Sequence, residues 1–352
     1  MRHAAINGSN AKLEFRHLSR KDPILVRVHQ VESVSRLPRQ LADPLYEKIV
    51  LWNDGTGLSA LDFQGFSNRH ALLFQLLSDV EPSANYLPPT LFHTGDRPIG
   101  HAGEVLSFSE RRGLADIGVP DFMFQQPLAP SVGWDELARD LAAAGSVPSE
   151  TDLLGWMGNP ARIPARYRLL TWGQKHAERA EFWATGAYYP RWSPRRRLSP
   201  VARRRAHQGM DILNQVRRFR YLIDVEGRGY SGRVKLLLHS GRPLFIAKRP
   251  WNEWWFTELE PFKEYIPVRR DLADLVEQLN WADSHPREAL EIARRAQDFA
   301  QRILTRASVL RRWHDVLNTR AASSLGESQA IQRMALPRSA KRRVAELVRC
   351  TE

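Results

Sequence analysis

Three observations in the sequence predict an α/β protein with parallel sheets and two domains. Runs with the spacing of strands alternate along the chain with runs that have helical spacing. The chain has 352 residues, which is enough for two domains, each with its own core. The stretch GRGYSG (227–232) has the spacing G-x-G-x-x-G and lies between a predicted strand and a predicted helix. This arrangement is the one in which α/β folds bind phosphate groups.

Composition limits the class of protein and its partners. Hydrophobic residues make up 43% of the chain, and 11 residues are Trp, which is typical of a globular protein. No apolar run approaches the roughly 18 residues of a membrane-spanning helix, and the N-terminus lacks the apolar region of a secretory signal. The single cysteine, Cys350, excludes an intramolecular disulfide, so we expect a cytoplasmic protein. The net charge of +13 predicts anionic partners: nucleotide phosphates, anionic lipid or glycolipid, or nucleic acid.

The predicted N-terminal domain covers residues 1–152 and mixes strands with helices. Its expected elements are a helix at 71–80, a strand at 90–96 that runs into a turn, a strand at 104–109, and a helix at 134–144 that ends before Gly145. The polar segment 145–152 contains Pro148, and it is therefore the predicted linker to the second domain.

The predicted second domain covers residues 153–306. Its expected elements are a strand at 153–158, a helix opened by Pro164, a strand at 221–226, a short helix from Ser231 as N-cap to Gly241, a strand at 243–248, and an amphipathic helix at 286–304. The apolar face of the last helix is predicted to carry Leu290, Ala293, Ala296, Phe299, Ala300 and Ile303.

Two basic segments are predicted to lie at the surface. Residues 191–220 hold ten Arg and one Asp, which indicates a loop or a helical insertion with a solvated basic face. That face is either a docking site for an anionic membrane or a solvated surface without a partner. The tail, 307–352, includes the basic amphipathic run 341–349, which either contacts lipid or packs back on the N-terminal domain.

The glycine motif does not indicate a dehydrogenase. A dinucleotide fold places Asp or Glu at the end of the next strand, where this chain has Lys248. Phosphate binding at a helix start remains the prediction. Arg233 and Arg166 are each predicted in the first turn of a helix, where a cation opposes the helix dipole. Either an anion between the two helix starts removes this conflict, or both arginines are exposed and have little effect.

Several stretches of the chain resemble glycosyltransferase family 90. They are EYIPVRRDLADLVEQLNWADSHPREALEIARRAQDFAQRIL, YLIDVEGRGYSGRVKLLLHSGRPLFIAK, NEWWFTELEPFKEYIPV, HTGDRP and LLGWMGNPARIPAR. The resemblance covers residues 85–305. It implies a GT-B architecture, in which two Rossmann-like domains face each other across a cleft. It also implies an inverting, metal-independent transfer of a sugar from a UDP-linked donor.

The resemblance also implies roles for individual residues. Asp96 is the expected catalytic base, and Arg166 and Arg233 are expected to hold the donor diphosphate. Arg162 is a rival for the role of Arg166, because the spacing from Gly158 to Arg166 is about one residue longer than in the family. The expected nucleotide-sugar-binding residues are Gly158, Gly227, Gly229, Tyr230, Ser231, Gly232 and Glu253, and the expected acceptor-side residues are His93 and Arg97.

The residues themselves agree with this chemistry. Asp96 directly follows a predicted strand, where a carboxylate faces the ligand site of an α/β sheet, although Asp also starts turns. We find no Asp-x-Asp motif for a metal-bound diphosphate, so we expect neither a metal nor a cofactor beside the UDP-sugar substrate. Without the resemblance, Glu253 could equally be a salt-bridged surface residue.

The expected acceptor is a glycan or glycolipid, either lipopolysaccharide core or a capsule precursor. The enzyme would then act in the cytoplasm and bind peripherally to the inner membrane. One alternative is a basic nucleic-acid-binding protein, although no nucleic-acid-binding motif supports it and we expect no such partner. Another alternative is a protein that binds a nucleotide sugar without turnover.

Overall fold

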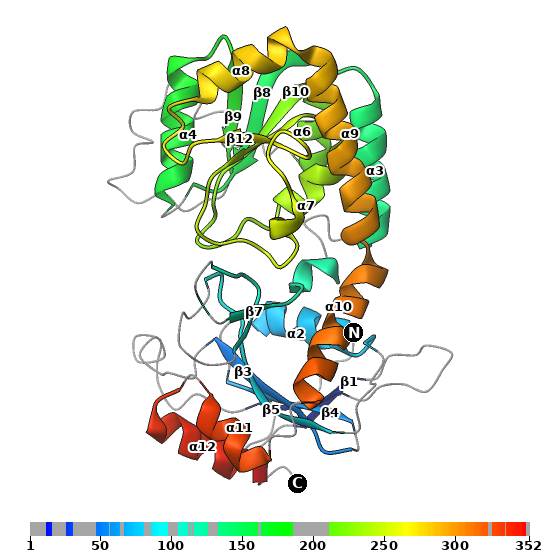
Figure 1. Ribbon diagram of the computed structural model, residues 1–352, viewed down its shortest axis with the longest axis vertical. Helices are drawn as coiled ribbons and strands as arrows, with labels where there is room; N and C mark the ends of the chain where they lie inside the picture. Colours follow the sequence, from blue (N-terminus) through cyan, green and yellow to red (C-terminus); the bar gives the residue numbers. More distant parts are fainter. Residues whose placement is uncertain are drawn as a thin grey trace. The chain divides into compact units, whose positions relative to one another are not determined.

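The computed structural model describes residues 12–15, 26–30, 47–55, 57–63, 67–80, 86–97, 105–111, 114, 116–125, 133–160, 163–185, 211–322, 326–334 and 336–349. The chain divides into two compact units (Figure 1). The first unit combines Met1–Pro130 with Arg306–Glu352, and the second is Ser131–Thr305. The division therefore does not fall in the predicted linker, 145–152.

The first unit contains a seven-stranded mixed sheet. Its strands, in spatial order, are β1 (Lys12–Phe15), β2 (Val26–Gln30), β4 (Leu58–Asp62), β3 (Lys48–Asn53), β5 (Leu87–His93), β6 (Val105–Ser107) and β7 (Asp116–Gly118). Its helices are α2 (Ser67–Leu77), η1 (Phe122–Phe124), α10 (Arg306–Ala321), α11 (Glu327–Arg333) and α12 (Arg338–Arg349). The predicted elements at 71–80, 90–96 and 104–109 correspond to α2, β5 and β6.

The prediction of parallel sheets is wrong for part of the first unit. β3 pairs antiparallel with both β4 and β5. The cause is a tight turn between β3 and β4, in which the side chain of Asn53 accepts hydrogen bonds from the backbone N–H groups of Gly55 and Gly57. Both glycines have positive φ angles, of 100° and 138°. Such a turn joins neighbouring antiparallel strands without a crossover helix.

The C-terminal helices α11 and α12 pack on the sheet of the first unit. Val344 and Val348 of α12 and Ile331 of α11 are buried in one apolar cluster with Val50 of β3 and Leu91 of β5. The basic run 341–349 thus buries its apolar face within the protein, while Arg342 and Arg349 are exposed.

The second unit contains a five-stranded sheet in which all pairs are parallel, as predicted. Its strands, in spatial order, are β12 (Ile266–Val268), β11 (Leu244–Ala247), β10 (Phe219–Asp224), β8 (Thr151–Gly158) and β9 (Ala180–Ala184). Its helices are α3 (Trp134–Ser146), α4 (Pro164–Lys175), α6 (Ile212–Arg218), α7 (Val234–Leu237), η3 (Leu238–Ser240), η4 (Phe256–Glu258), α8 (Leu275–Ser284) and α9 (Pro286–Ile303). Of the basic segment 191–220, residues 191–210 lie outside the described residues.

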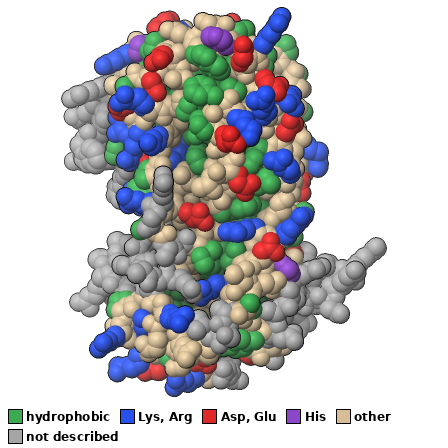
Figure 2. All heavy atoms as spheres, in the orientation of Figure 1, with side chains coloured by type: hydrophobic (Ala, Val, Ile, Leu, Met, Phe, Trp, Pro, Cys, Tyr) green, Lys and Arg blue, Asp and Glu red, His purple; other side chains and the backbone are tan. Residues whose placement is uncertain are grey.

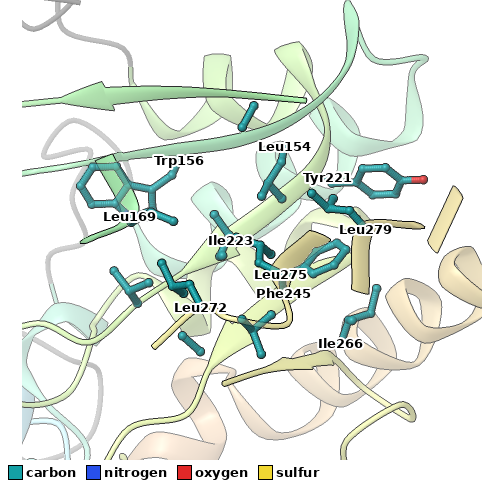
Figure 3. Packing of buried hydrophobic residues seen from close by; sticks show 14 of the residues in the cluster. Leu154, Trp156, Leu169, Tyr221, Ile223, Phe245, Ile266, Leu272, Leu275 and Leu279 are labelled. Atoms are coloured by element: carbon teal, nitrogen blue, oxygen red, sulfur yellow. The ribbon is translucent and has the colours of Figure 1, made fainter. Parts of the chain in front are cut away.

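One apolar cluster joins the sheet of the second unit to α4 and α8 (Figure 3). Trp156 of β8, Ile223 of β10 and Phe245 of β11 project from the sheet into this cluster, where they meet Leu169 of α4 and Leu275 of α8. All five side chains are fully buried. This packing fixes the strand ends at which the candidate site lies.

Helix α9 was predicted correctly, and so was most of its buried face, because Ala293, Ala296, Phe299 and Ala300 are buried as expected. Leu290 is 61% exposed, whereas Ala289 and Ile292 are buried. The buried face thus includes Ala289 and Ile292 in place of Leu290, and Ile303 is only partly buried.

Helix α3 does not end before Gly145, as the sequence predicted, but continues to Ser146. Gly145 permits a close approach between α3 and η3. A Cβ atom at position 145 would lie only 1.6 Å from the backbone oxygen of Ser240. At the other end of the helix, the indole of Trp134 donates a hydrogen bond to the backbone oxygen of Leu304, at 2.6 Å.

We predict that Gly145→Ala destabilises the second unit by about 1–3 kcal/mol, because the added methyl group forces α3 away from η3. At most helical positions the same substitution stabilises by roughly 1 kcal/mol. Urea unfolding followed by tryptophan fluorescence measures the change. Gly133→Ala is the control, because a Cβ atom at Gly133 meets nothing within 4 Å. Equal stability of the two variants would contradict the prediction.

Candidate active site

The carboxyl ends of β8 and β10 lie side by side at one edge of the parallel sheet. The two strands are paired neighbours and end at Gly158 and Asp224. Ligands of open α/β sheets bind at this edge. Most of the predicted donor-binding residues follow these two strands directly in the sequence.

Two cationic side chains approach the indole of Trp156 at this edge. The guanidinium carbon of Arg166 is 5.9 Å from the ring centroid, and that of Arg233 is 5.3 Å from it. The ring itself is fully buried. Arg166 comes from the first turn of α4 and Arg233 from the start of α7, so the tertiary structure brings together the two arginines that the sequence predicted to act together.

Two glycines leave room for this arrangement. A Cβ atom at Gly158 would lie 2.7 Å from the Trp156 ring and 2.9 Å from Nη1 of Arg233. A Cβ atom at Gly227 would lie 2.5 Å from the backbone oxygen of Tyr230. Any larger residue at position 158 would displace either the ring or the guanidinium group.

Asp224 anchors a buried polar cluster next to the two arginines. Its carboxylate accepts hydrogen bonds from Arg249 Nη1 at 2.8 Å, from Ser231 Oγ at 3.0 Å and from Arg233 Nη2 at 3.5 Å. Arg249 is fixed further, because it also donates to the backbone oxygens of Asp224 and Ala247. Arg233, in contrast, has only the long contact to the carboxylate within this cluster.

The cluster holds two guanidinium groups and one carboxylate, so it carries an excess positive charge. Burial lowers the pKa of Arg233. The negative charge of Asp224 raises this pKa, and the positive charge of Arg249 lowers it further. A guanidinium nevertheless stays charged in proteins. An anionic ligand would therefore be stabilised at Arg233, where the cation is desolvated and weakly bound by the protein.

Ser231 does not cap the following helix. Its hydroxyl binds Asp224, and the helix begins after Arg233, which occupies the N-cap position. The helix is also shorter than predicted, because α7 has four residues and continues as the single turn η3. It ends at Gly241, as predicted, with a positive φ of 66°.

Glu253 is buried and forms an ion pair with Lys235, at 2.5 Å. Lys235 also lies 5.3 Å from the ring centroid of Tyr230. Gly229 is buried, and Gly232 is partly buried, in the loop that leads to α7. A role for Glu253, Tyr230 or these glycines in binding a nucleotide sugar stays a prediction.

The choice between Arg166 and Arg162 also stays a prediction, because Arg162 lies outside the described residues. Arg166 donates a hydrogen bond from Nη1 to the backbone oxygen of Asn159, at 2.7 Å. This bond ties the first turn of α4 to the residue that follows β8.

The predicted acceptor-side residues lie in the first unit, at the end of β5. His93 is the last residue of the strand, and Asp96 follows it after a short turn. Burial, with a smaller contribution from the charge of Lys48, lowers the pKa of His93 to about 4, so the ring is neutral at pH 7. Arg97 is exposed.

Arg69 of α2 binds Asp96, at 2.7 Å between Nη1 and Oδ1. The sequence reasoning missed this residue, as it missed Trp156, Asp224 and Arg249. Arg249 stands just beyond the end of the predicted strand 243–248, so a search of strand ends for charged residues would have found it, whereas Asp224 lies inside the predicted strand 221–226. No local signal connects Arg69 to Asp96, because 27 positions separate them.

The described residues include neither a metal centre nor a membrane-spanning helix. They contain no group of three or more His, Cys, Asp or Glu side chains that could hold a metal ion. None of their helices is long and apolar enough to cross a membrane.

The sequence profile of glycosyl transferase family 90 matches residues 90–334. The chain belongs to this family. This family 90 chain is 36% identical over 97 residues to Protein O-glucosyltransferase 2 of Danio rerio, an alignment that covers 28% of this chain and 19% of that protein. It is 26% identical over 223 residues to Protein O-glucosyltransferase 1 of Rattus norvegicus, which covers 60% of this chain and 55% of that protein.

The chain thus spans about half or less of the length of these curated relatives. Among solved structures, a glycosyltransferase from Rickettsia africae matches the family 90 chain with a TM-score of 0.43 and 12% identity. This alignment covers 66% of this chain and 71% of the other.

We predict that Asp224→Asn destabilises the second unit by about 3–5 kcal/mol, because it leaves Arg233 and Arg249 buried together without a counter-charge. Urea unfolding measures the effect. Glu291→Gln is the control, because Glu291 pairs with Arg294 and Arg295 on the exposed face of α9, where ion pairs contribute little to stability. If Asp224→Asn lowered the free energy of unfolding as little as the control does, this explanation of the cluster would be contradicted.

Proposed function

We propose that this family 90 chain is an inverting, metal-independent glycosyltransferase that moves a sugar from a UDP-linked donor to a hydroxyl group of a glycan. The observation that carries the proposal is the convergence of Arg166 and Arg233 on Trp156. Two cations at one ring repel each other unless an anion lies close to both, and a diphosphate provides that anion.

The reaction removes a proton from the acceptor hydroxyl and builds negative charge on the leaving diphosphate, and the protein has to stabilise both changes. The acceptor oxygen attacks the anomeric carbon as its proton passes to a base, and the bond from that carbon to the diphosphate oxygen breaks with the electron pair on UDP. Arg166 and Arg233 stabilise the leaving diphosphate in the way that a metal ion does in other transferases. Asp96 accepts the proton.

Burial strengthens the proposed role of Arg233. Its guanidinium group is already desolvated by the protein, so a bound phosphate does not have to displace a full hydration shell. Each charge-assisted hydrogen bond to the diphosphate is worth about 1.5–3 kcal/mol. Gly158 keeps the space beside this group open.

The proposed acceptor is a lipopolysaccharide core or a capsule precursor, at the cytoplasmic face of the inner membrane. The resemblance to the family and the net charge of +13 support this part of the proposal. The names of the matched relatives make UDP-glucose the first donor to test.

No specific observation favours nucleic-acid binding: on the face in Figure 2, Lys and Arg side chains are interspersed with Asp and Glu.

We predict that Asp96→Asn lowers turnover of UDP-glucose by about 10²–10⁴, because an amide cannot accept the acceptor proton. UDP affinity stays unchanged, since the diphosphate ligands are in the second unit. Release of UDP, with water or a glycan as acceptor, measures turnover, and calorimetry measures UDP binding. Asp315→Asn, on the exposed side of α10, is the control and retains full turnover. Unchanged turnover in Asp96→Asn would exclude Asp96 as the base.

We predict that Gly158→Ala weakens UDP binding about 10-fold, or by 1.4 kcal/mol, because the methyl group displaces Arg233 or Trp156. Calorimetric titration with UDP in the absence of divalent metal measures the change. Gly133→Ala, in the same unit and without a neighbour within 4 Å, binds UDP like the unaltered chain. A folded Gly158→Ala variant with full UDP affinity would remove Arg233 from the donor site.

A further inference from the structure

Helix α2 contacts the Asp96 loop through two consecutive side chains. Arg69 donates a hydrogen bond to Asp96 Oδ1, at 2.7 Å. The neighbouring side chain, His70, binds the hydroxyl of Thr94 through Nε2, at 2.7 Å. A single turn of one helix therefore binds the loop on both sides of Gly95.

The His70 contact belongs to a buried chain of hydrogen bonds. Nδ1 of His70 lies 2.8 Å from Asp62 Oδ1, and His70, Asp62 and Thr94 are all buried. The Thr94 hydroxyl donates to the backbone oxygen of Glu47, at 2.9 Å, and also lies within hydrogen-bond distance of Nε2 of His70. These two contacts hold the Thr94 side chain between α2 and Glu47.

The same chain of hydrogen bonds holds a strained residue. Glu47 has a φ of 59°, which is unfavourable for a residue with a side chain. Its backbone oxygen accepts both the N–H and the hydroxyl of Thr94, at 2.8 Å and 2.9 Å. A Cβ atom at Gly95 would lie 2.7 Å from Oε2 of Glu47 and 2.5 Å from Nε2 of His93. The loop before Asp96 is thus confined between the ends of β3 and β5.

Among the described residues, the carboxylate of Asp96 is bound at one oxygen. Oδ1 accepts the hydrogen bond from Arg69, and Oδ2 accepts none from the described residues. The backbone of Asp96 is fixed separately, because its oxygen accepts a hydrogen bond from Ser109 Oγ, at 3.1 Å. Arg69 is itself oriented by the ring of Phe122, whose centroid lies 5.2 Å from the guanidinium carbon.

This pair contributes little to stability. Both side chains keep more than a quarter of their surface exposed, and exposed ion pairs contribute about 0–1 kcal/mol. Its effect is on geometry. With Oδ1 held by a cation, the rotation of the carboxyl group is fixed and Oδ2 is the oxygen that can accept a proton.

We propose that Arg69 is a positioning residue for transfer: it orients the Asp96 carboxylate so that Oδ2 receives the proton of the acceptor hydroxyl. This inference rests on the proposed role of Asp96 as the base. Arg69 does not take the proton and does not bind the donor. Its loss therefore slows the chemical step without weakening donor binding.

The test compares Arg69→Gln, Arg69→Lys and Arg69→Ala with the unaltered chain, with UDP-glucose as donor and release of UDP as readout. Arg69→Gln lowers kcat about 10- to 100-fold, the loss that a misplaced reacting group causes, while KM for the donor and UDP affinity stay unchanged. Arg69→Lys recovers part of kcat, because the ammonium group can still bind Oδ1. Added guanidinium raises kcat of Arg69→Ala.

Arg343→Gln is the matched control. Arg343 is also a partly buried arginine of the first unit next to an aromatic ring, 6.0 Å from the centroid of Phe63, but it has no place in the proposed reaction. Its kcat stays unchanged, and guanidinium has no effect on it. The thermal midpoints of Arg69→Gln and Arg343→Gln are expected to be equal.

Full kcat in Arg69→Gln, together with an inactive Asp96→Asn, would overturn the positioning role and leave the proposed function in place. A raised donor KM or a much lower thermal midpoint in Arg69→Gln would also overturn it, since the loss would then be structural. Full turnover in Asp96→Asn, or no turnover of any UDP-sugar by the unaltered chain, would refute the proposed function itself.

Discussion

The candidate donor site depends on the buried carboxylate of Asp224. It stands at the end of β10, where it binds Arg249 tightly and Arg233 loosely. Without it, two buried guanidinium groups would face each other, and their repulsion would open the carboxyl edge of the sheet. With it, the cluster keeps one excess positive charge at the group that is least tied to the protein. The same arrangement therefore provides both the stability of the cluster and its affinity for an anion. The carboxylate offsets the cost of burying two cations, but it neutralises only one of them.

The packing of β8 and β10 explains why the excess positive charge of the cluster lies beside Trp156. Trp156 is held in the apolar cluster beneath α4, and its ring forms the surface that both Arg166 and Arg233 approach. Two glycines of β8 occupy positions where no Cβ atom fits. Gly158 lies against Arg233, and Gly155 lies against the ring of Phe219. Core packing thus determines the shape of the site, because the residue that supports both cations is itself a core residue.

The first unit fixes its candidate base by another means. Asp96 lies in a loop, and loops lack the regular backbone hydrogen bonds that hold a strand end in place. Groups outside the loop replace them: the side chains of Arg69 and His70 from α2, the side chain of Ser109 from beyond β6, and the backbone oxygen of the strained Glu47 before β3. Backbone strain persists only where the surroundings enforce it, and it often occurs near functional sites.

Periodicity, glycine spacing and strand–helix alternation are local signals, and from them the order and type of most elements and the parallel sheet of the second unit could be predicted. The same signals suggested that Arg166 and Arg233 act together on an anion, and that role stays a prediction. The antiparallel pairs of β3, the continuation of α3 through Gly145 and the exposure of Leu290 on α9 were not predicted, since each depends on what packs against the element. Only the tertiary structure placed Arg249 on Asp224, Ser231 on the same carboxylate, and Arg69 on Asp96. The two arginine contacts join residues 25 and 27 positions apart in the chain, and no local pattern predicts which distant charge a buried or half-buried carboxylate will bind.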